Sequence, residues 1–268
     1  MPGRIVLTDL DGTLLDARTY AWRPAEAALE RLRDLGVPLI LTSSKTRAEI
    51  ECWRERLGNT DVFVSENGGG VYFPKGCAAQ APRAASPWDG YQRIALGTAY
   101  PEVRRALLEI RRETGLDLRG FGDMPIEEIE DRTGLAREDA ERARQREFDE
   151  PFVWDDPDYA FDERRIAASA QARGLRVSRG GRFHHLHGAH DKSACVRAIA
   201  EAYGGGETVG LGDGANDRDL LGAVDRAFVV ARPDGSHERD LRRAIPGATF
   251  TRAAGPAGFA EAIAALFG

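Results

Sequence analysis

Short apolar runs alternate with amphipathic stretches along most of the chain. Apolar residues at helical spacing predict helices over Pro24–Leu35 and Thr46–Leu57, and Gly36 and Gly58 follow where these helices should end. Strands that alternate with helices predict an α/β fold with a doubly wound, mostly parallel, Rossmann-like core sheet. We expect its buried strands at five apolar runs: Ile5–Leu7, Val37–Leu41, Val62–Val64, Val209–Leu211 and Phe228–Val230.

The pattern changes between residues 85 and 187. Helical stretches are predicted there over Pro101–Glu113, Ile126–Arg144 and Phe161–Arg173, beside short strands such as LRVS and GRFHHLH. We interpret residues 85–187 as an α+β domain inserted into a core domain formed by residues 1–84 and 188–268. Its entry is rich in Ala and Pro and its exit contains Gly188, so we expect hinges near Ser86 and Gly188.

Small or acidic polar residues follow four of the five predicted strands. In an open α/β sheet the ligand crevice lies outside the carboxyl ends of the strands, so we expect these side chains to meet at one site. They are Thr8 and Asp9, Thr42 and Ser43, Ser65–Asn67, and Asp213.

Two acidic pairs occur in these segments. Asp9 and Asp11 lie in LTDLDGTLLD, and Asp213 and Asp217 lie in GLGDGAND. Two like charges about 4 Å apart repel by about 4 kcal/mol at an effective dielectric near 20, so a cation is needed to offset the crowding. Mg²⁺ prefers oxygen ligands, and one ion would neutralise both pairs. We therefore predict Mg²⁺ as the cofactor, with these four residues as its ligands.

The same strings have other readings. DLDG resembles the start of a calcium loop, but Thr13 occupies the third ligand position and a strand precedes it. Gly210, Gly212 and Ala215 fit a dinucleotide fingerprint, but Asp213 and Asp217 would then repel a pyrophosphate. A nucleotide-binding oxidoreductase and a catalytically silent binding module remain as alternative functions.

A phosphate bound beside the metal needs a hydroxyl donor and a positive charge. Ser43 supplies the hydroxyl and Lys192, at the start of a predicted helix, supplies the ammonium. Taken singly, Ser43 also reads as a helix cap for the stretch from Thr46, and Lys192 as a surface residue. Their occurrence at both places that the site requires favours the phosphate reading.

Composition excludes several classes of protein. The chain has 268 residues, 42% hydrophobic and 30% charged, with a formal net charge of −6, which argues against a nucleic-acid surface. No apolar run approaches a membrane span and no signal segment precedes the first strand, so we expect a cytoplasmic protein without a membrane partner. Cys52, Cys77 and Cys195 form no short-spaced pair, as expected in a reducing compartment.

The acidic and phosphate-binding residues resemble a known set of motifs. Asp9, Asp11, Gly12 and Thr13, then Ser43, then Lys192, and finally Asp213, Asn216 and Asp217 resemble, in order, the four motifs of the haloacid dehalogenase superfamily. The inserted domain is similar to the α/β cap of the sugar-phosphatase branch. The strings SSKTRAE, SENGGGVYFP, REFDEPFVW and GGRFHHLHG are similar to those of mannosyl-3-phosphoglycerate phosphatases.

This resemblance implies a Mg²⁺-dependent phosphatase that acts on a small-molecule sugar phosphate, mannosyl-3-phosphoglycerate first, with glucosyl-3-phosphoglycerate or sucrose phosphate as alternatives. Asp9 would be the nucleophile and a metal ligand. Asp11 would be the general acid and then the general base, and would bind the metal through its backbone carbonyl. Asp213 would complete the metal site with Asp217 nearby, and Lys192 and Ser43 would contact the phosphoryl group.

Substrate recognition is expected from both domains. On the core side, Lys45 and Asn67 follow strand ends. On the cap side, a glycerate carboxylate would need a cation, and Arg182 is the first choice, with Arg146 and Arg179 behind it. His184 is a further candidate; a zinc site among His184, His185, His187 and His190 is disfavoured because no cysteine or acid joins them at ligand spacing.

Overall fold

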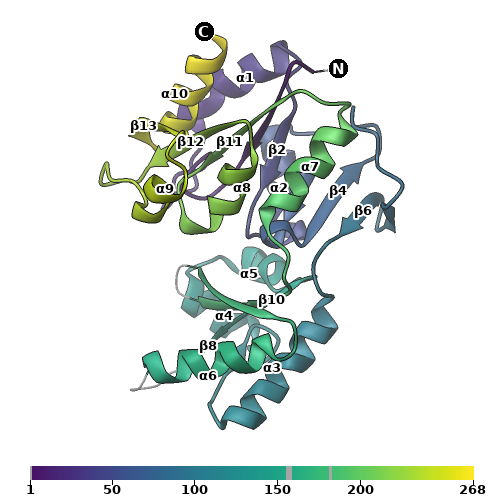
Figure 1. Cartoon of the computed structure of the whole chain (residues 1–268), viewed down its shortest axis with the longest axis vertical. Helices are drawn as coiled ribbons and strands as arrows, with labels where there is room; N and C mark the ends of the chain where they lie inside the picture. Colours follow the sequence, from purple (N-terminus) through teal and green to yellow (C-terminus); the bar gives the residue numbers. More distant parts are fainter. Residues whose placement is uncertain (1, 155–158, 181–182) are drawn as a thin grey trace.

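The computed structural model of the protein describes residues 2–154, 159–180 and 183–268, which fold around two sheets (Figure 1). The larger sheet has the strand order β13-β12-β11-β1-β2-β3-β4-β6-β5, and the smaller has the order β7-β8-β10-β9. The strands of the larger sheet are β1 (Arg4–Thr8), β2 (Leu39–Thr42), β3 (Phe63–Ser65), β4 (Gly70–Pro74), β5 (Ser86–Trp88), β6 (Tyr91–Ala95), β11 (Glu207–Gly212), β12 (Arg226–Ala231) and β13 (Thr249–Ala254).

Helices cover both faces of the larger sheet. Side chains alternate between these faces along each strand, and the buried strands are apolar on both. Val6 faces one helical layer, whereas Ile5 and Leu7 face the other. The predicted doubly wound α/β core is confirmed, and β1, β2, β3, β11, β12 and β13 pair in parallel. One layer contains α1 (Glu26–Asp34), α2 (Arg47–Leu57) and α10 (Gly255–Phe267), and the other contains α7 (Lys192–Ala202) and α8 (Arg218–Ala223).

Local sequence signals define the ends of α2. The Thr46 side chain accepts a hydrogen bond from the Glu49 backbone N–H, and the Glu49 side chain accepts one from the Thr46 N–H, which completes a capping box. Gly58 ends the helix in the left-handed conformation at φ 61°, as predicted from its position. This helix therefore starts at a fixed point directly after the polar end of β2.

The predicted boundary at residue 85 is wrong. Strands β5 and β6 continue the larger sheet in antiparallel order beside β4, so residues 86–95 belong to the core sheet. The Ala- and Pro-rich segment before Ser86 is a loop between β4 and β5, and composition alone does not separate such a loop from a domain connection. The chain passes to the smaller sheet only after Ala95.

The smaller sheet lies between two groups of helices. Phe152, Leu186 and Val177 pack on α3 and α6, whereas Val153 and Phe183 pack on α4 and α5. The predicted helix Ile126–Arg144 is two helices, because Gly134 ends α4 in the left-handed conformation. The elements are α3 (Tyr100–Thr114), β7 (Arg119–Gly120), α4 (Ile126–Thr133), α5 (Arg137–Ala143), β8 (Asp149–Val153), α6 (Tyr159–Gln171), β9 (Arg176–Gly180) and β10 (Phe183–His187); α9 (Arg239–Ala244) belongs to the larger unit.

Two chain segments pass side by side between the sheets, one after β6 and one after β10. At Gly188 an added Cβ would lie 2.5 Å from Thr98 Oγ1 and 2.9 Å from the Thr98 backbone nitrogen, so the two crossings are in close contact. Gly188 is thus at a connection, as predicted, but its neighbour is Thr98 rather than Ser86. None of the helices in the described parts of the chain has the length and apolar character needed to cross a membrane.

Candidate active site

The polar ends of three neighbouring strands meet at the carboxyl edge of the larger sheet. Asp9 follows β1, Ser43 follows β2 and Asp213 follows β11, and β1 pairs with both of the other strands. The Asp9 N–H donates to Leu211 O at 2.9 Å and the Ser43 N–H to Val64 O at 3.1 Å, so the backbone stays paired beyond the strand ends. The sheet therefore places these three side chains with little freedom to move.

Lys192 is the buried cation of this site. It begins α7, which Asp191 caps by accepting a hydrogen bond from the Ser193 N–H at 2.9 Å. Its Nζ lies 2.7 Å from Asp217 Oδ1 and 3.2 Å from Asp9 Oδ1, with 1% of the residue exposed. Burial opposes the charged form, but Asp217 and Asp9 outweigh it and raise the pKa of Lys192. The ammonium is charged at every physiological pH.

Asp213 approaches the loop after β1 closely. Its Oδ1 accepts a hydrogen bond from Thr13 Oγ1 at 3.0 Å. Gly12 has φ +82°, and a Cβ there would lie 2.6 Å from Asp213 Oδ2, so only glycine fits this approach. The Gly12-Thr13 pair that follows Asp11 thus positions a carboxylate from the other half of the sequence.

Asp217 fixes the loop around it. Its Oδ2 accepts hydrogen bonds from the backbone N–H groups of Asp213 and Gly214, at 3.1 and 3.0 Å, while Oδ1 receives Lys192. Both oxygens are therefore engaged by the protein. The side chain holds Lys192 and the Asp213 backbone in place.

The acidic group fits a hard divalent cation. Ligand atoms of Asp9, Asp213 and Asp217 all lie within 4.8 Å of one another. Burial, then repulsion from Asp217, raises the pKa of Asp9, and the same two causes raise the pKa of Asp213 to about 7. Lys192 alone thus leaves negative charge uncompensated, and carboxylate oxygens suit Mg²⁺. In the described part of the chain, the histidines of β10 join no such group.

Asp11 faces Lys45 rather than the acidic group. Its Oδ2 lies 2.7 Å from Lys45 Nζ, and 38% of its side chain is exposed. Asp11 Oδ1 is buried without a hydrogen-bond partner. Lys45 also lies 4.0 Å from Glu49 Oε1 and 5.0 Å from the centre of the Tyr20 ring. The geometry leaves the Asp11 carboxylate available to a ligand, and Lys45 orients it.

Ser43 and Asn67 are brought together with these groups. The Asn67 N–H donates to Ser43 O at 3.0 Å, and Ser43 Oγ accepts from the Lys45 N–H at 3.3 Å. Asn67 Oδ1 is buried without a partner. Thr46 and not Ser43 caps α2, so the helix-cap reading of Ser43 is wrong.

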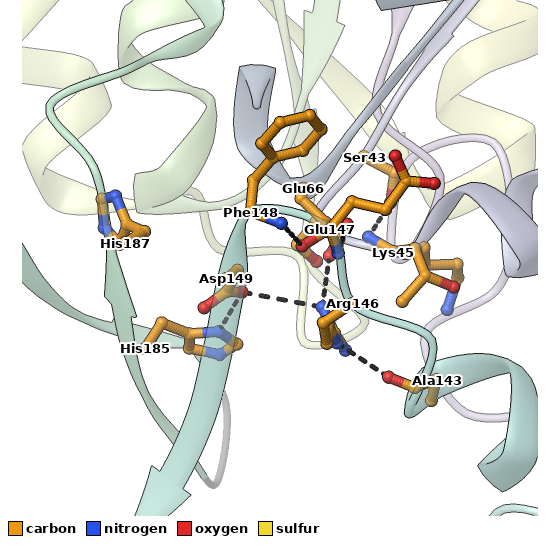
Figure 2. Close-up of polar contacts among 12 residues, drawn as sticks. Ser43, Lys45, Glu66, Ala143, Arg146, Glu147, Phe148, Asp149, His185 and His187 are labelled. Carbon is orange, nitrogen blue, oxygen red and sulfur yellow. Dashed lines mark hydrogen bonds and ion pairs between the residues drawn. The ribbon is translucent and has the colours of Figure 1, made fainter. Parts of the chain in front are cut away.

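Glu66 joins the two units below this site (Figure 2). It is 0% exposed, and its two carboxylate oxygens accept hydrogen bonds from the backbone N–H groups of Glu147 and Phe148, each at 2.9 Å. Burial raises the pKa of Glu66 to about 8. Glu66 and Asn67 have φ of +48° and +54°, an arrangement that L side chains rarely adopt. The surrounding structure therefore holds this loop in a strained form.

Arg146 is used by the protein itself. Its Nε donates to Ala143 O at 2.7 Å and its Nη1 to Ser44 O at 3.1 Å, and Nη1 lies 3.6 Å from Asp149 Oδ2 (Figure 2). The guanidinium thus fastens the smaller unit, the expected cap, to the segment that carries Ser43 and Lys45. Arg146 was expected to bind the substrate carboxylate; the structure corrects this, because its guanidinium is engaged by Ala143, Ser44 and Asp149.

The other cap candidates lie elsewhere. His184 packs on Trp154, with ring centres 4.3 Å apart, and Arg179 lies opposite His184 in the β9–β10 register and is exposed. Both side chains belong to the sheet face that packs on α3 and α6, so the structure does not bring them to the core, and this corrects their assignment. Arg182 lies outside the described residues.

The sequence proposed His184 as the substrate-binding histidine, but in the structure it is His185, paired with Asp149, that lies on the side of the smaller sheet facing the core. His185 Nδ1 lies 2.7 Å from Asp149 Oδ2, on the sheet face turned toward the core (Figure 2). Strand alternation along GRFHHLH predicts that His185 and His187 share a face, but it does not indicate which face meets the core. Glu66 lies in the polar strand end Ser65–Asn67 that the sequence predicts at this edge, but its contact with the smaller unit was not predicted.

A family model described as haloacid dehalogenase-like hydrolase matches residues 6–81. A protein of Methanococcoides burtonii named glucosyl-3-phosphoglycerate/mannosyl-3-phosphoglycerate phosphatase is 37% identical over 268 residues, which cover 98% of this chain and 97% of the relative. A protein of Persephonella marina with the same name is 37% identical over 240 residues, 87% of each chain.

Solved structures match the fold over the whole chain. A haloacid dehalogenase-like hydrolase from Bacteroides thetaiotaomicron has a TM-score of 0.70 at 18% identity, with 98% of this chain and 99% of that chain covered. A protein of Thermoplasma acidophilum has a TM-score of 0.70 at 16% identity, covering 98% and 97%. At these identities the likeness concerns the fold alone.

Proposed function

Because the chain belongs to the haloacid dehalogenase-like hydrolases, in one family with the glucosyl-3-phosphoglycerate/mannosyl-3-phosphoglycerate phosphatases, we propose that it hydrolyses the phosphomonoester of a glycosyl-3-phosphoglycerate. The observation that carries the proposal is the arrangement of Asp9, Asp213 and Lys192 at one sheet edge, with Asp11 beside them. Mannosyl-3-phosphoglycerate is the first candidate substrate. Glucosyl-3-phosphoglycerate and sucrose phosphate are the alternatives.

Asp9 is the nucleophile in this proposal. Its carboxylate attacks phosphorus, the bond to the sugar-side oxygen breaks, and an aspartyl phosphate forms that water then hydrolyses. Lys192 lies 3.2 Å from Asp9 Oδ1 and holds the carboxylate while its charge faces the phosphoryl oxygens. Ser43 offers its hydroxyl to the same oxygens. Stabilising the transferring phosphoryl group supplies most of the catalysis of such reactions.

Asp11 carries the proton. The leaving group is a poor alkoxide, so a protonated carboxyl group that donates to it lowers the barrier. Once the leaving group has departed, the Asp11 carboxylate accepts a proton from the attacking water. Lys45 at 2.7 Å keeps the carboxylate turned toward the cleft during both steps.

Asp9 and Asp213 are the residues that would hold Mg²⁺, with the Asp11 backbone carbonyl as a further ligand, and Asp217 acting through Lys192 and the loop. When bound, Mg²⁺ would neutralise the acidic group and polarise the phosphoryl oxygens. The engaged oxygens of Asp217 favour this supporting role over direct coordination, which had been its assigned role.

A phosphate-release screen tests the proposal. Purified protein is incubated with mannosyl-3-phosphoglycerate, glucosyl-3-phosphoglycerate, sucrose phosphate, hexose phosphates and p-nitrophenyl phosphate, with Mg²⁺ or with EDTA. We expect turnover with Mg²⁺, its loss in EDTA, and the highest kcat/KM with a glycosyl-3-phosphoglycerate. Preference for a different sugar phosphate would overturn the substrate, and the absence of phosphate release from every compound would overturn the activity.

A further inference from the structure

A cavity of about 280 Å³ adjoins the acid/base end of the proposed site. It lies between the loop after the first acidic motif, the outer turns of α2, and the segment that joins α4 to α5. This volume is near the lower end of the range for small-molecule sites, about 300–1,000 Å³. Three aromatic rings line it, those of Tyr20, Trp22 and Trp53.

The rings form a rigid wall. Trp53 belongs to the core of the larger unit, and its ring centre lies 6.2 Å from that of Tyr20 and 5.8 Å from that of Trp22. Trp22 stands edge-on to Trp53, with an interplanar angle of 85°. Aromatic faces carry negative potential and attract the positively polarised C–H groups of a ligand.

Tyr20 is held in a strained backbone conformation. Its φ is +57°, a left-handed conformation that is uncommon for a bulky side chain. Hydrogen bonds from the Tyr20 N–H to Asp16 O, at 3.0 Å, and from the Asp16 N–H to Ala21 O, at 2.9 Å, keep the loop in this form. Such strain concentrates at ligand-binding positions, where the surrounding structure fixes a side chain in place.

Polar groups lie around the rings and connect the cavity to the reacting groups. Lys45 lies 5.0 Å from the Tyr20 ring centre and 2.7 Å from Asp11 Oδ2, so one side chain separates the aromatic wall from the general acid. Glu49 and Asp139 line the same cavity, one from each unit. Lys45 and Arg56 also line it and balance these two acids, so the lining carries no net charge. Carboxylates accept hydrogen bonds from hydroxyl groups, and a lining without net charge suits a neutral polyhydroxylated ligand.

We propose that this cavity binds the sugar ring of the substrate, with C–H groups of the ring against Tyr20 and Trp22, and its hydroxyls directed to Glu49 and Asp139. The inference rests on the proposed function, because it places the leaving group of that reaction. A sugar phosphate then spans from the phosphoryl site through Asp11 to the cavity. Residues of the core as well as the cap would thus contact the sugar and contribute to substrate specificity.

Cys52 provides a direct probe, because it lines the cavity and its thiol is free. Cys77 is a matched control within the same protein: it is also free and partly exposed, but it lies in the loop after β4. We would follow alkylation of both thiols by peptide mass spectrometry in Asp9→Asn, saturated with the sugar phosphate that the native enzyme turns over best. Saturation is checked by calorimetry.

We expect the ligand to slow the alkylation of Cys52 by about tenfold or more and to leave that of Cys77 unchanged, whereas inorganic phosphate slows neither. An unchanged rate at Cys52 under saturation would overturn the sugar subsite, whichever sugar phosphate is used. Failure of the proposed function appears separately, as preference for another sugar phosphate or as no turnover at all.

A second arm uses Tyr20→Gly, because glycine adopts the left-handed backbone without strain and removes the ring. We expect kcat/KM for the sugar phosphate to fall about tenfold more than that for p-nitrophenyl phosphate, through KM. Trp88→Ala is the control, because the exposed Trp88 ring lies over Arg93 at the edge of the sheet. An equal loss on both substrates would contradict the assignment.

Discussion

At the scale of single residues, the buried acidic group opposes folding. Burial and the neighbouring Asp217 raise the pKa of Asp9, so ionised Asp9 destabilises the folded protein at neutral pH in the absence of a cation. Its raised pKa gives stability at low pH that is lost as pH rises. The proposed reaction needs the ionised form, because a carboxylate is the nucleophile that would attack phosphorus.

Asp9→Asn separates these two requirements. We expect it to abolish turnover and, in EDTA, to raise the free energy of unfolding by about 1–2 kcal/mol, because Oδ1 remains for Lys192 while a crowded charge is removed. Thermal unfolding and phosphate release measure the two effects. Asp217→Asn is the matched control with the opposite sign: it should destabilise, since Asp217 receives Lys192 and two backbone N–H groups. Turnover within tenfold of the native enzyme would exclude Asp9 as the nucleophile.

His184 gives a second prediction at this scale. Burial, then Arg179, lowers the pKa of His184 to about 4, below its ordinary value of 6.5. The unfolded chain therefore binds a proton more readily between these values, so the stability due to neutral His184 is present above pH 6.5 and is lost as pH falls toward 4. His184→Phe should flatten this part of the curve of unfolding free energy against pH, measured by denaturant unfolding at a series of pH values. A curve of unchanged slope in His184→Phe would contradict the prediction.

At the scale of elements, the loop after β3 contacts both the Ser43 segment of the core and the cap. Glu66, Asn67 and Gly68 all have positive φ, and the Glu66 carboxylate receives two N–H groups from the segment that leads into β8. Helix α5, which precedes that segment, contacts the start of α2, because Thr46 Oγ1 donates to Arg142 O at 2.9 Å. The loop thus has a fixed partner on the far side of the cleft.

Glu66→Ala should loosen this contact. Two buried N–H groups lose their acceptors, and each unmade hydrogen bond costs about 1–3 kcal/mol, so we expect a destabilisation of about 2–6 kcal/mol. We also expect a larger loss of kcat/KM for the sugar phosphate than for p-nitrophenyl phosphate, since the cap is the part displaced. Glu66→Gln, which retains one acceptor, should lie between the native protein and Glu66→Ala in both stability and kcat/KM. Equal kinetic losses on both substrates would show that Glu66 supports only the core.

The elements also show what local sequence patterns can predict. The strands and α2 followed from apolar runs and a terminal glycine, and both are properties of adjacent residues. The end of the core at Ala95 did not follow, because β5 joins the sheet through pairing with β6, which no composition shift marks. The meeting of the acidic residues at one sheet edge was predictable because parallel strands end together, whereas His184 was chosen without knowledge of which sheet face meets the core.

At the scale of the whole molecule, the two crossings behave as one joint. Gly188 and Thr98 touch, and Leu96 and Gly97 both donate backbone hydrogen bonds to Gly69 O at 2.9 Å. The joint therefore lies against the loop that carries Glu66. A change at the joint should reach the cap and the active site together.

Gly188→Ala tests the joint. Its Cβ would lie 2.9 Å from the Thr98 backbone nitrogen, so a backbone segment must shift, and we expect a destabilisation of about 1–3 kcal/mol with a fall in sugar phosphate turnover. Gly222→Ala is the matched control, because nothing lies within 4 Å of a Cβ at that helical glycine, and it should be neutral or slightly stabilising. Native-like melting and turnover in Gly188→Ala would mean that the crossings move freely past each other.

The contacts of Glu147 have a consequence for how new specificities arise. This cap residue binds Arg47 at 2.8 Å, Arg93 at 2.7 Å and Tyr72 Oη at 2.9 Å, and all three partners belong to the core. A cap transplanted from a distant relative would meet a core whose buried acids and bases were selected for a different partner. An exchanged cap would lose these contacts, so exchange of whole caps should destabilise the protein. We therefore expect substrate range to change by point substitutions within a cap that stays with its own core.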